Sequence, residues 1–198
     1  MPIAEQKRCS VICEPEDISL EIDLPLTWDE YLNQLNQKQR HEVKRKFRRL
    51  GEAGEIRFQI FDNIDGNSDL IELFFDLFKK SRTDKTEFMT NKMESFFKAM
   101  IFTMAKLNIL KIGILFLNNK PAASVLYFDY NNSFYLYNNG YDPDFNSLSV
   151  GVLSKAFCIQ KAIDFKRKKF DFLKGQEIYK YRLGGKEVPL TKCRIMIK

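Results

Sequence analysis

The sequence predicts one mixed α/β (α+β) domain in which a mostly antiparallel central sheet is flanked by helices. Three observations support this class. Strand-like segments joined by tight asparagine turns form a meander in the middle of the chain, segments with helical spacing of apolar residues surround it, and short strands follow near the end. With 198 residues, of which 44% are hydrophobic, the chain is long enough to bury the core of one such domain.

We expect the first 26 residues to form an N-terminal extension or an edge strand, and residues 27–198 to form the domain itself. The strand signal is the alternation of apolar and polar residues before Pro25, with the apolar side formed by Ile18, Leu20, Ile22 and Leu24. A helix of about six turns is predicted next. Thr27 is a suitable N-cap with Glu30 three residues later, and Gly51 and Gly54 end the helix.

The second half of this helix is strongly basic. Residues 38–49 contain a single acid, Glu42, and seven cations: Lys38, Arg40, Lys44, Arg45, Lys46, Arg48 and Arg49. Such a block can bind the phosphates of a coenzyme, an RNA or a lipid surface, and Arg40 and Lys44 are therefore candidate substrate-binding residues. The alternative is a solvated helix face without a ligand.

The remaining elements follow in a defined order. We expect a strand at 56–61, helices at 68–80 and 91–107, strands at 109–117, 121–130 and 133–138, a helix at 150–165, a strand around Phe170, a short helix at 177–183 and a last strand near 193–197. The two-residue asparagine turns between the three middle strands predict an antiparallel meander.

The candidate chemistry is concentrated in residues 169–180. Within about ten residues this segment contains two carboxylates, Asp171 and Glu177, the phenol of Tyr179 and the amine of Lys180. These groups can move protons or hold an anion. The alternative is structural: Asp171 caps a turn, Glu177 and Lys180 form an ion pair one helical turn apart, and Tyr179 packs its ring.

Two stretches carry a family resemblance. The run Asp-Phe-Leu-Lys-Gly-x-Glu-x-Tyr-Lys, from Asp171 to Lys180, resembles the C-terminal signature of the CelD/BcsL-like and FemAB-like branch of the GNAT acyltransferase superfamily. The pattern of Trp28 to Leu50 resembles the first helix of the same branch. The order of predicted elements is also that of GNAT proteins.

The resemblance implies an acyl-CoA-dependent N-acyltransferase, with acetyl-CoA or another acyl-CoA as co-substrate and no metal. In GNAT folds the acyl-pantetheine arm lies where the last meander strand diverges from the strand after the next helix, and the pyrophosphate meets that helix's N-terminus. The implied cofactor-binding residues are Tyr135, Leu136, Tyr137, Asn138, Ser147, Leu148, Ser149, Val150 and Gly151. Val150 departs from the branch, which usually has proline there.

The implied catalytic residues are Asp171, Glu177, Tyr179 and Lys180. Tyr179 is the candidate acid for the thiolate, Glu177 or Asp171 the candidate base, and Lys180 a candidate anchor for an anionic substrate group. An ion pair between Lys180 and either carboxylate competes with these assignments.

Two rival functions remain open. One is a FemAB-like peptidyltransferase with aminoacyl-tRNA as donor, and the other a non-catalytic module that binds RNA or an anionic surface through the basic helix. The expected acceptor is a small molecule or an amine-bearing precursor of the cell envelope or of a polysaccharide. Members of the branch usually carry another lobe before the matched region. A further alternative is therefore that this chain is the C-terminal lobe of a two-lobe protein.

Four scattered cysteines and a single histidine, His41, provide neither a zinc ligand set nor a visible disulfide framework. Cys9 and Cys13 lack the Cys-x-x-Cys spacing of a metal or redox pair. The sequence therefore predicts reduced thiols. No run is long and apolar enough to span a membrane and residues 1–20 do not resemble a signal peptide, so we expect a cytoplasmic protein.

Overall fold

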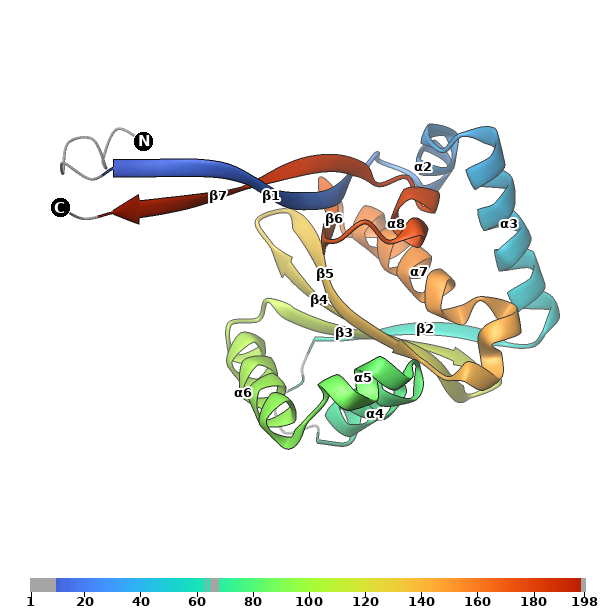
Figure 1. Cartoon of the computed structure of the whole chain (residues 1–198). Helices are drawn as coiled ribbons and strands as arrows, with labels where there is room; N and C mark the ends of the chain where they lie inside the picture. Colours follow the sequence, from blue (N-terminus) through green and yellow to red (C-terminus); the bar gives the residue numbers. More distant parts are fainter. Residues whose placement is uncertain (1–9, 63, 65–67, 197–198) are drawn as a thin grey trace.

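A single sheet organises the molecule (Figure 1). The computed structural model describes residues 10–62, 64 and 68–196. In this part of the chain seven strands lie in the order β2-β3-β4-β5-β6-β1-β7, and every neighbouring pair is antiparallel except β5 with β6. The strands are β1 (Ser10–Asp23), β2 (Ile56–Phe61), β3 (Leu110–Leu117), β4 (Lys120–Tyr130), β5 (Ser133–Tyr141), β6 (Lys169–Lys174) and β7 (Lys186–Met196). The predicted mixed, mostly antiparallel sheet is confirmed.

Helices cover both faces of the sheet (Figure 1). One face carries α4 (Ser68–Lys80), α5 (Thr83–Phe88) and α6 (Asn91–Lys106), and the other carries α2 (Trp28–Gln34), α3 (Gln37–Glu52) and α7 (Val150–Asp164). The short helices η1 (Pro143–Leu148) and α8 (Ile178–Arg182) stand before α7 and after β6. Buried side chains accordingly form two clusters, one on each face, rather than a single core. None of the described helices combines the length and apolarity needed to cross a membrane.

The meander depends on its asparagine turns. Asn118 and Asn119 connect β3 to β4, and Asn131 and Asn132 connect β4 to β5; all four have φ between 48° and 61°. Two consecutive residues with positive φ are what a tight type I′ hairpin turn requires, and asparagine tolerates this conformation better than most residues. The predicted antiparallel meander is therefore confirmed.

The six-turn helix predicted from Thr27 is wrong, because two helices occupy the segment. Thr27 caps α2 as expected, with Glu30 completing the capping box, but α2 ends at Gln34. Leu35 is extended and buried, and Asn36 then caps α3 with Gln39 as its partner. A second capping box therefore overrides the continuous apolar spacing. The short helices α5 and η1 were not predicted either.

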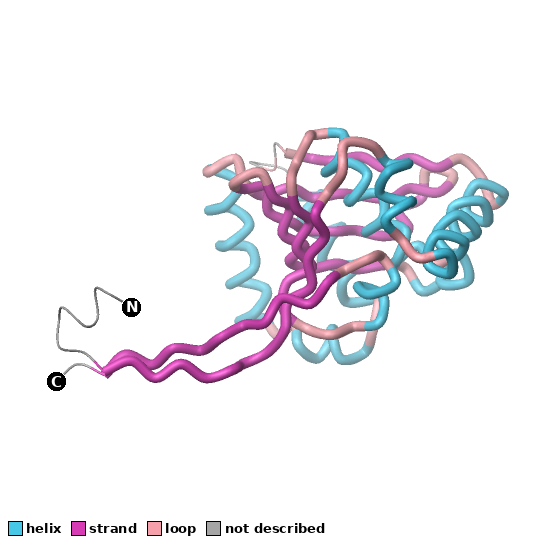
Figure 2. The backbone as a smooth tube through the Cα atoms, turned by 90° about the horizontal axis from the view of Figure 1, so that it is seen from above, coloured by secondary structure: helices cyan, strands magenta, loops and turns pink. Residues whose placement is uncertain are grey.

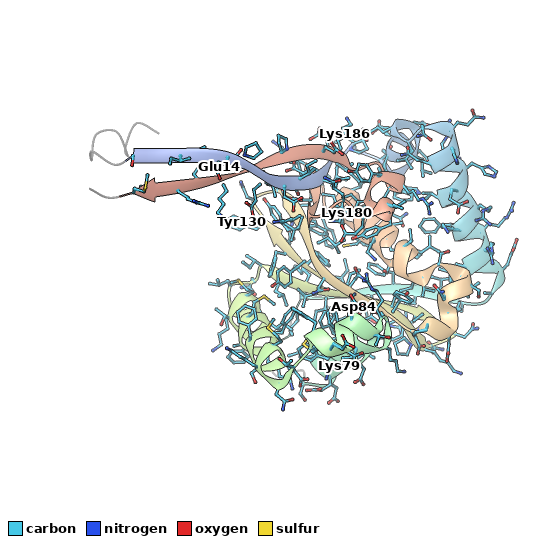
Figure 3. All side chains as sticks on the ribbon, in the orientation of Figure 1. Glu14, Lys79, Asp84, Tyr130, Lys180 and Lys186 are labelled. Carbon is cyan, nitrogen blue, oxygen red and sulfur yellow. A yellow bond between two sulfur atoms is a disulfide. The ribbon has the colours of Figure 1, made fainter. Side chains whose placement is uncertain are left out.

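The N-terminal strand lies inside the sheet, between β6 and β7, rather than at its edge. β6 pairs with β1 from Ser19 onward, whereas β7 pairs with it from Ser10 to Glu21. The outer part of β1 and β7 consequently projects from the body as a two-stranded ribbon, with Glu14 on it (Figures 2 and 3). Residues 1–9 of the predicted extension lie outside the described residues.

The expectation of reduced thiols is also wrong. Cys13 and Cys193 form a disulfide across the ribbon, where strand pairing places them directly opposite each other. They are 180 residues apart in sequence, so only the pairing of the two terminal strands reveals the bridge. Cys158 is a buried free thiol, and Cys9 lies outside the described residues. Disulfides persist mainly in oxidising compartments, and the compartment of this protein stays a prediction.

Candidate active site

The candidate site lies where β5 and β6 separate. The two strands pair in parallel only from Ser133 to Tyr135, opposite Lys169 to Asp171. A pocket of about 470 Å³ lies beyond this point, lined on one side by residues 136–139 and on the other by residues 172–174. A register shift against β4 makes Tyr137 an extra residue in β5, which bends the strand locally. The predicted divergence of these two strands is present.

Asp171 shapes the end of β6. Its Oδ1 accepts hydrogen bonds from the Ser19 hydroxyl at 2.8 Å and from the Leu173 main-chain N–H at 2.7 Å. Leu173 has φ 60° and Gly175 has φ 112°, so the chain turns sharply away from β5 here. Glycine adopts this conformation without strain, but leucine rarely does. Burial raises the pKa of Asp171, and this carboxylate does not line the pocket.

Lys180 holds the same turn from inside. Its side chain is 2% exposed, and Nζ donates to the main-chain oxygens of Leu173, Lys174 and Gly175 at 2.9–3.1 Å. Glu177 forms an ion pair with it at 2.9 Å. Figure 3 shows Lys180 within the body of the molecule. These contacts occupy the ammonium group, and they match the structural alternative for the Glu177–Lys180 pair, except that Lys180 is buried rather than on the surface.

Tyr179 forms part of the pocket wall. Its ring packs edge-on against Phe172, with ring centroids 6.2 Å apart, and the Lys155 ammonium lies 4.6 Å from the centroid of the Tyr179 ring. Burial raises the pKa of Tyr179, so the phenol keeps its proton at neutral pH. A protonated hydroxyl in a pocket wall can donate a proton to a bound group.

The start of α7 forms the far end of the pocket. Ser149 has φ 58° and makes no side-chain cap, and its hydroxyl instead accepts a hydrogen bond from Lys46 of α3 at 2.8 Å. Gly151 leaves room for a neighbour, because an added Cβ would come within 2.9 Å of the Tyr141 ring. The basic helix α3 therefore touches the turn at which the sequence predicts the donor's phosphates, through Lys46.

The predicted residues divide into two groups. Those that line the pocket are Leu136, Tyr137, Asn138, Ser149, Gly151, Glu177, Tyr179 and Lys180, and those that do not are Tyr135, Ser147, Leu148, Val150, Asp171, Arg40 and Lys44. Val150 is fully buried in the core, Ser147 is exposed in η1, and Arg40 donates to the side-chain oxygen of Asn33 at 3.2 Å.

Four of the cations that line the pocket were not predicted as site residues: Arg82, Lys85, Lys155 and Lys174. Two of them, Lys85 of α5 and Lys155 of α7, form no ion pair among the described residues. A signal for Lys155 exists: it stands at helical spacing between Val152 and Ile159, so a lysine occupies the apolar face of the helix. Lys85 belongs to a helix that was not predicted, and nothing local marks it.

The lining has a surplus of positive charge. Among the described residues, its cations are Arg82, Lys85, Lys155, Lys174 and Lys180, and its single carboxylate is Glu177. Such a lining attracts anions and raises their local concentration. The pocket is therefore suited to a negatively charged ligand.

Comparison with known families decides the assignment. The family model described as Acetyltransferase (GNAT) domain matches residues 37–181, which include the basic helix, the meander and the Asp171–Lys180 signature. The chain belongs to the GNAT acetyltransferase family. The finer CelD/BcsL-like assignment stays a prediction. No curated protein matches this GNAT chain in a sequence comparison.

Solved structures resemble the GNAT domain at low identity. FemX is 10% identical to this chain with a TM-score of 0.65, and the match covers 88% of this chain and 60% of FemX. The C-terminal domain of a putative lysylphosphatidylglycerol synthetase from Agrobacterium fabrum is 9% identical (TM-score 0.61; 92% and 61% covered). L-PGS from Bacillus licheniformis is 10% identical (TM-score 0.53; 85% and 50%). These likenesses show a shared fold, and the chain spans 50–61% of the length of each protein.

Proposed function

We propose that this GNAT domain transfers an acyl group from a coenzyme A thioester to an amine. The observation that carries the proposal is the opening between β5 and β6, with its pocket and its surplus of cations. A thioester donor brings both an activated acyl group and a chain of phosphates. The opening fits the pantetheine arm, and the positive lining fits the phosphates.

The donor's two ends have different partners. Residues 136–138 lie beyond the β5–β6 ladder, so their main chain faces the pocket instead of a neighbouring strand. A strand edge of this kind can bind an extended amide-bearing chain by main-chain hydrogen bonds. The first N–H groups of α7, near Gly151, favour the pyrophosphate, because helix N-termini carry unsatisfied donors and a partial positive charge. Lys46 adds a cation beside this turn.

The chemistry requires two proton transfers. The acceptor amine must lose a proton, and the sulfur leaving group must gain one. Tyr179 keeps its proton and lines the pocket, so we assign it the second role. Glu177 lines the pocket with 55% of its side chain exposed, and we assign it the first role, directly or through water. Asp171 and Lys180 then have a structural role, because they hold the turn at residues 173–175 that precedes Glu177 and Tyr179.

The comparisons support a cell-envelope acceptor, and one contact favours an alternative donor. One resembling structure is named as that of a putative lysylphosphatidylglycerol synthetase, and we extend its cell-envelope substrate class to this chain; that the accepting atom is an amine nitrogen is part of the proposal. The rival donor is an aminoacyl-tRNA. It is favoured by the contact of the basic helix α3 with the pocket through Lys46 and Ser149, because a cationic helix can follow a phosphate backbone.

A thermal-shift experiment tests the donor. Coenzyme A and acetyl-CoA should raise the melting temperature of the protein, because a ligand selective for the native state stabilises it. Gly151→Asp should abolish the shift by placing negative charge where the pyrophosphate binds. Gly151→Ala is the matched control, since it introduces the same close contact with Tyr141 without the charge.

Retention of the shift in Gly151→Ala, together with its loss in Gly151→Asp, would support the proposal. An unchanged shift in Gly151→Asp would place the coenzyme elsewhere. The rival donor would be favoured if neither coenzyme A nor acetyl-CoA shifted the melting temperature and tRNA bound in a salt-sensitive way, because phosphate-backbone binding weakens steeply with salt.

A further inference from the structure

Two lysines reach the pocket from opposite faces of the sheet. Lys85 belongs to α5, on the face covered by α4 and α6, and Lys155 belongs to α7 on the other face (Figure 1). Both line the pocket because the separation of β5 from β6 opens the sheet between them. The proton transfers proposed above use neither residue.

Each of the two ammonium groups donates one hydrogen bond to a main-chain oxygen. Lys155 Nζ donates to the Gly151 main-chain oxygen at 2.5 Å, and Lys85 Nζ donates to that of Asn139. The other contacts are aromatic: Lys85 lies 4.6 Å from the centroid of the Phe78 ring, and Lys155 lies over the Tyr179 ring. Within residues 10–62, 64 and 68–196, neither lysine forms an ion pair with a carboxylate.

The carboxylate that lines the pocket, Glu177, is already engaged, because it pairs with Lys180 at 2.9 Å. A buried or partly buried charge is costly unless an opposite charge balances it. Lys180 satisfies this condition, with Glu177 and three carbonyl oxygens around it. The two lysines of the pocket do not.

Burial lowers the pKa of both lysines. Burial, followed by the charge of Lys85, lowers the pKa of Lys155 to about 7. Burial, followed by the charge of Arg82, lowers the pKa of Lys85 to about 8. Smaller effects come from Glu177, Cys158 and Lys180 on Lys155, and from Asp84 on Lys85. An anion between the two ammonium groups would offset both the burial and the repulsion.

We propose that Lys85 and Lys155 form a subsite for an anionic group, a carboxylate or a phosphate, carried by the amine acceptor. We assign the subsite to the acceptor because Lys155 lies against the ring of Tyr179, the proposed acid. Lys155 also contacts the Gly151 oxygen at the start of α7, so competition with coenzyme A tests this assignment. The inference rests on the proposed transferase function and narrows it. The acceptor is then an acidic amine, with its carboxylate or phosphate close to the nucleophilic nitrogen.

The test uses small anions as probes. Inorganic phosphate and acetate are titrated into the coenzyme A-saturated protein at constant ionic strength set with chloride, and binding is followed by thermal shift. Saturable stabilisation is expected. Lys85→Met and Lys155→Met should each weaken it roughly tenfold or more, because each removes a charge-assisted hydrogen bond.

Lys161→Met is the matched control. Lys161 lies on α7 like Lys155, but it does not line the pocket and it pairs with Asp164, so its loss should leave anion binding unchanged. The coenzyme A shift should persist in all three variants and shows that each is folded. If coenzyme A did not stabilise the wild type but anions still bound through Lys85 and Lys155, the proposed donor would be refuted and the anion subsite would be supported.

The pH dependence gives an independent readout. Acetate keeps its charge above neutral pH, whereas the two lysines lose theirs above pH values of about 7 and 8. Acetate affinity should therefore fall by about tenfold or more between pH 7 and pH 9, because binding must then take up protons.

Preference for phosphate or for acetate would identify the acceptor's anionic group and support the proposal either way. Three results would overturn it: no saturable binding of either anion, equal binding in the lysine variants and the wild type, or anion binding that coenzyme A abolishes. The last result would assign the two lysines to the donor's phosphates.

Discussion

Replacing Lys180 with methionine is expected to lower the free energy of unfolding by about 2–4 kcal/mol, because it leaves the buried carbonyl oxygens of the β6 turn without a donor. Three main-chain oxygens, of residues 173–175, now accept from one ammonium. The methionine chain has similar length, so the apolar packing of the stem is largely kept. Urea unfolding of the two proteins measures the difference.

Lys174→Met serves as the comparison for Lys180→Met. Lys174 is 56% exposed and its ion pairs lie on the surface, so its removal should cost less than about 1 kcal/mol. Equal small losses in the two variants would show that Lys180 does not hold the turn. Lys180 would then be available to a substrate, as the sequence predicts.

Tyr179→Phe is expected to lower turnover by about 10²- to 10⁴-fold with acetyl-CoA and a competent amine, because it removes the proposed acid and nothing else. The ring still packs against Phe172 and Lys155, so coenzyme binding and stability should change little. Steady-state kinetics should place the loss in kcat rather than in KM.

Varying the thiol leaving group of the donor distinguishes a catalytic acid at Tyr179 from a tyrosine that only packs its ring. A thioester with a more acidic thiol needs less protonation, so Tyr179→Phe should lose less activity with that donor than with acetyl-CoA. A variant within about threefold of the wild type with both donors would remove Tyr179 from the mechanism.

Much of the fold was predictable because its signals are local. The asparagine pairs at 118–119 and 131–132 have the positive φ values that tight hairpins need, and the spacing of apolar residues located the helices on both sides of the meander. The break at Leu35 was missed because the apolar spacing continues across it. The capping box that starts the second helix, Asn36 with Gln39, was nevertheless visible in the sequence.

The candidate site was only partly predictable. Residues near Gly151 and Tyr179 were found because a local motif marks them, and the structure places both in the pocket. Lys85 reaches the pocket through the packing of α5 against the sheet, which no local pattern reports. The Cys13–Cys193 bridge likewise depends on pairing between the two ends of the chain.

The contacts of Lys180 with the main-chain oxygens of the turn could not be read from the sequence either, although its ion pair with Glu177 was an alternative there. They require Leu173 at φ 60°, a conformation that leucine rarely adopts. This turn is held by Asp171, whose carboxylate accepts from Leu173 and from Ser19, a residue 152 positions away.

A crystal structure of the protein grown with coenzyme A tests the central claim most directly. We expect the pantetheine arm between residues 136–138 and residues 172–174, with main-chain hydrogen bonds to β5, and the pyrophosphate at the N-terminus of α7 beside Ser149 and Gly151. Coenzyme bound outside this opening, or β5 and β6 paired along their whole length with no space between them, would contradict the account.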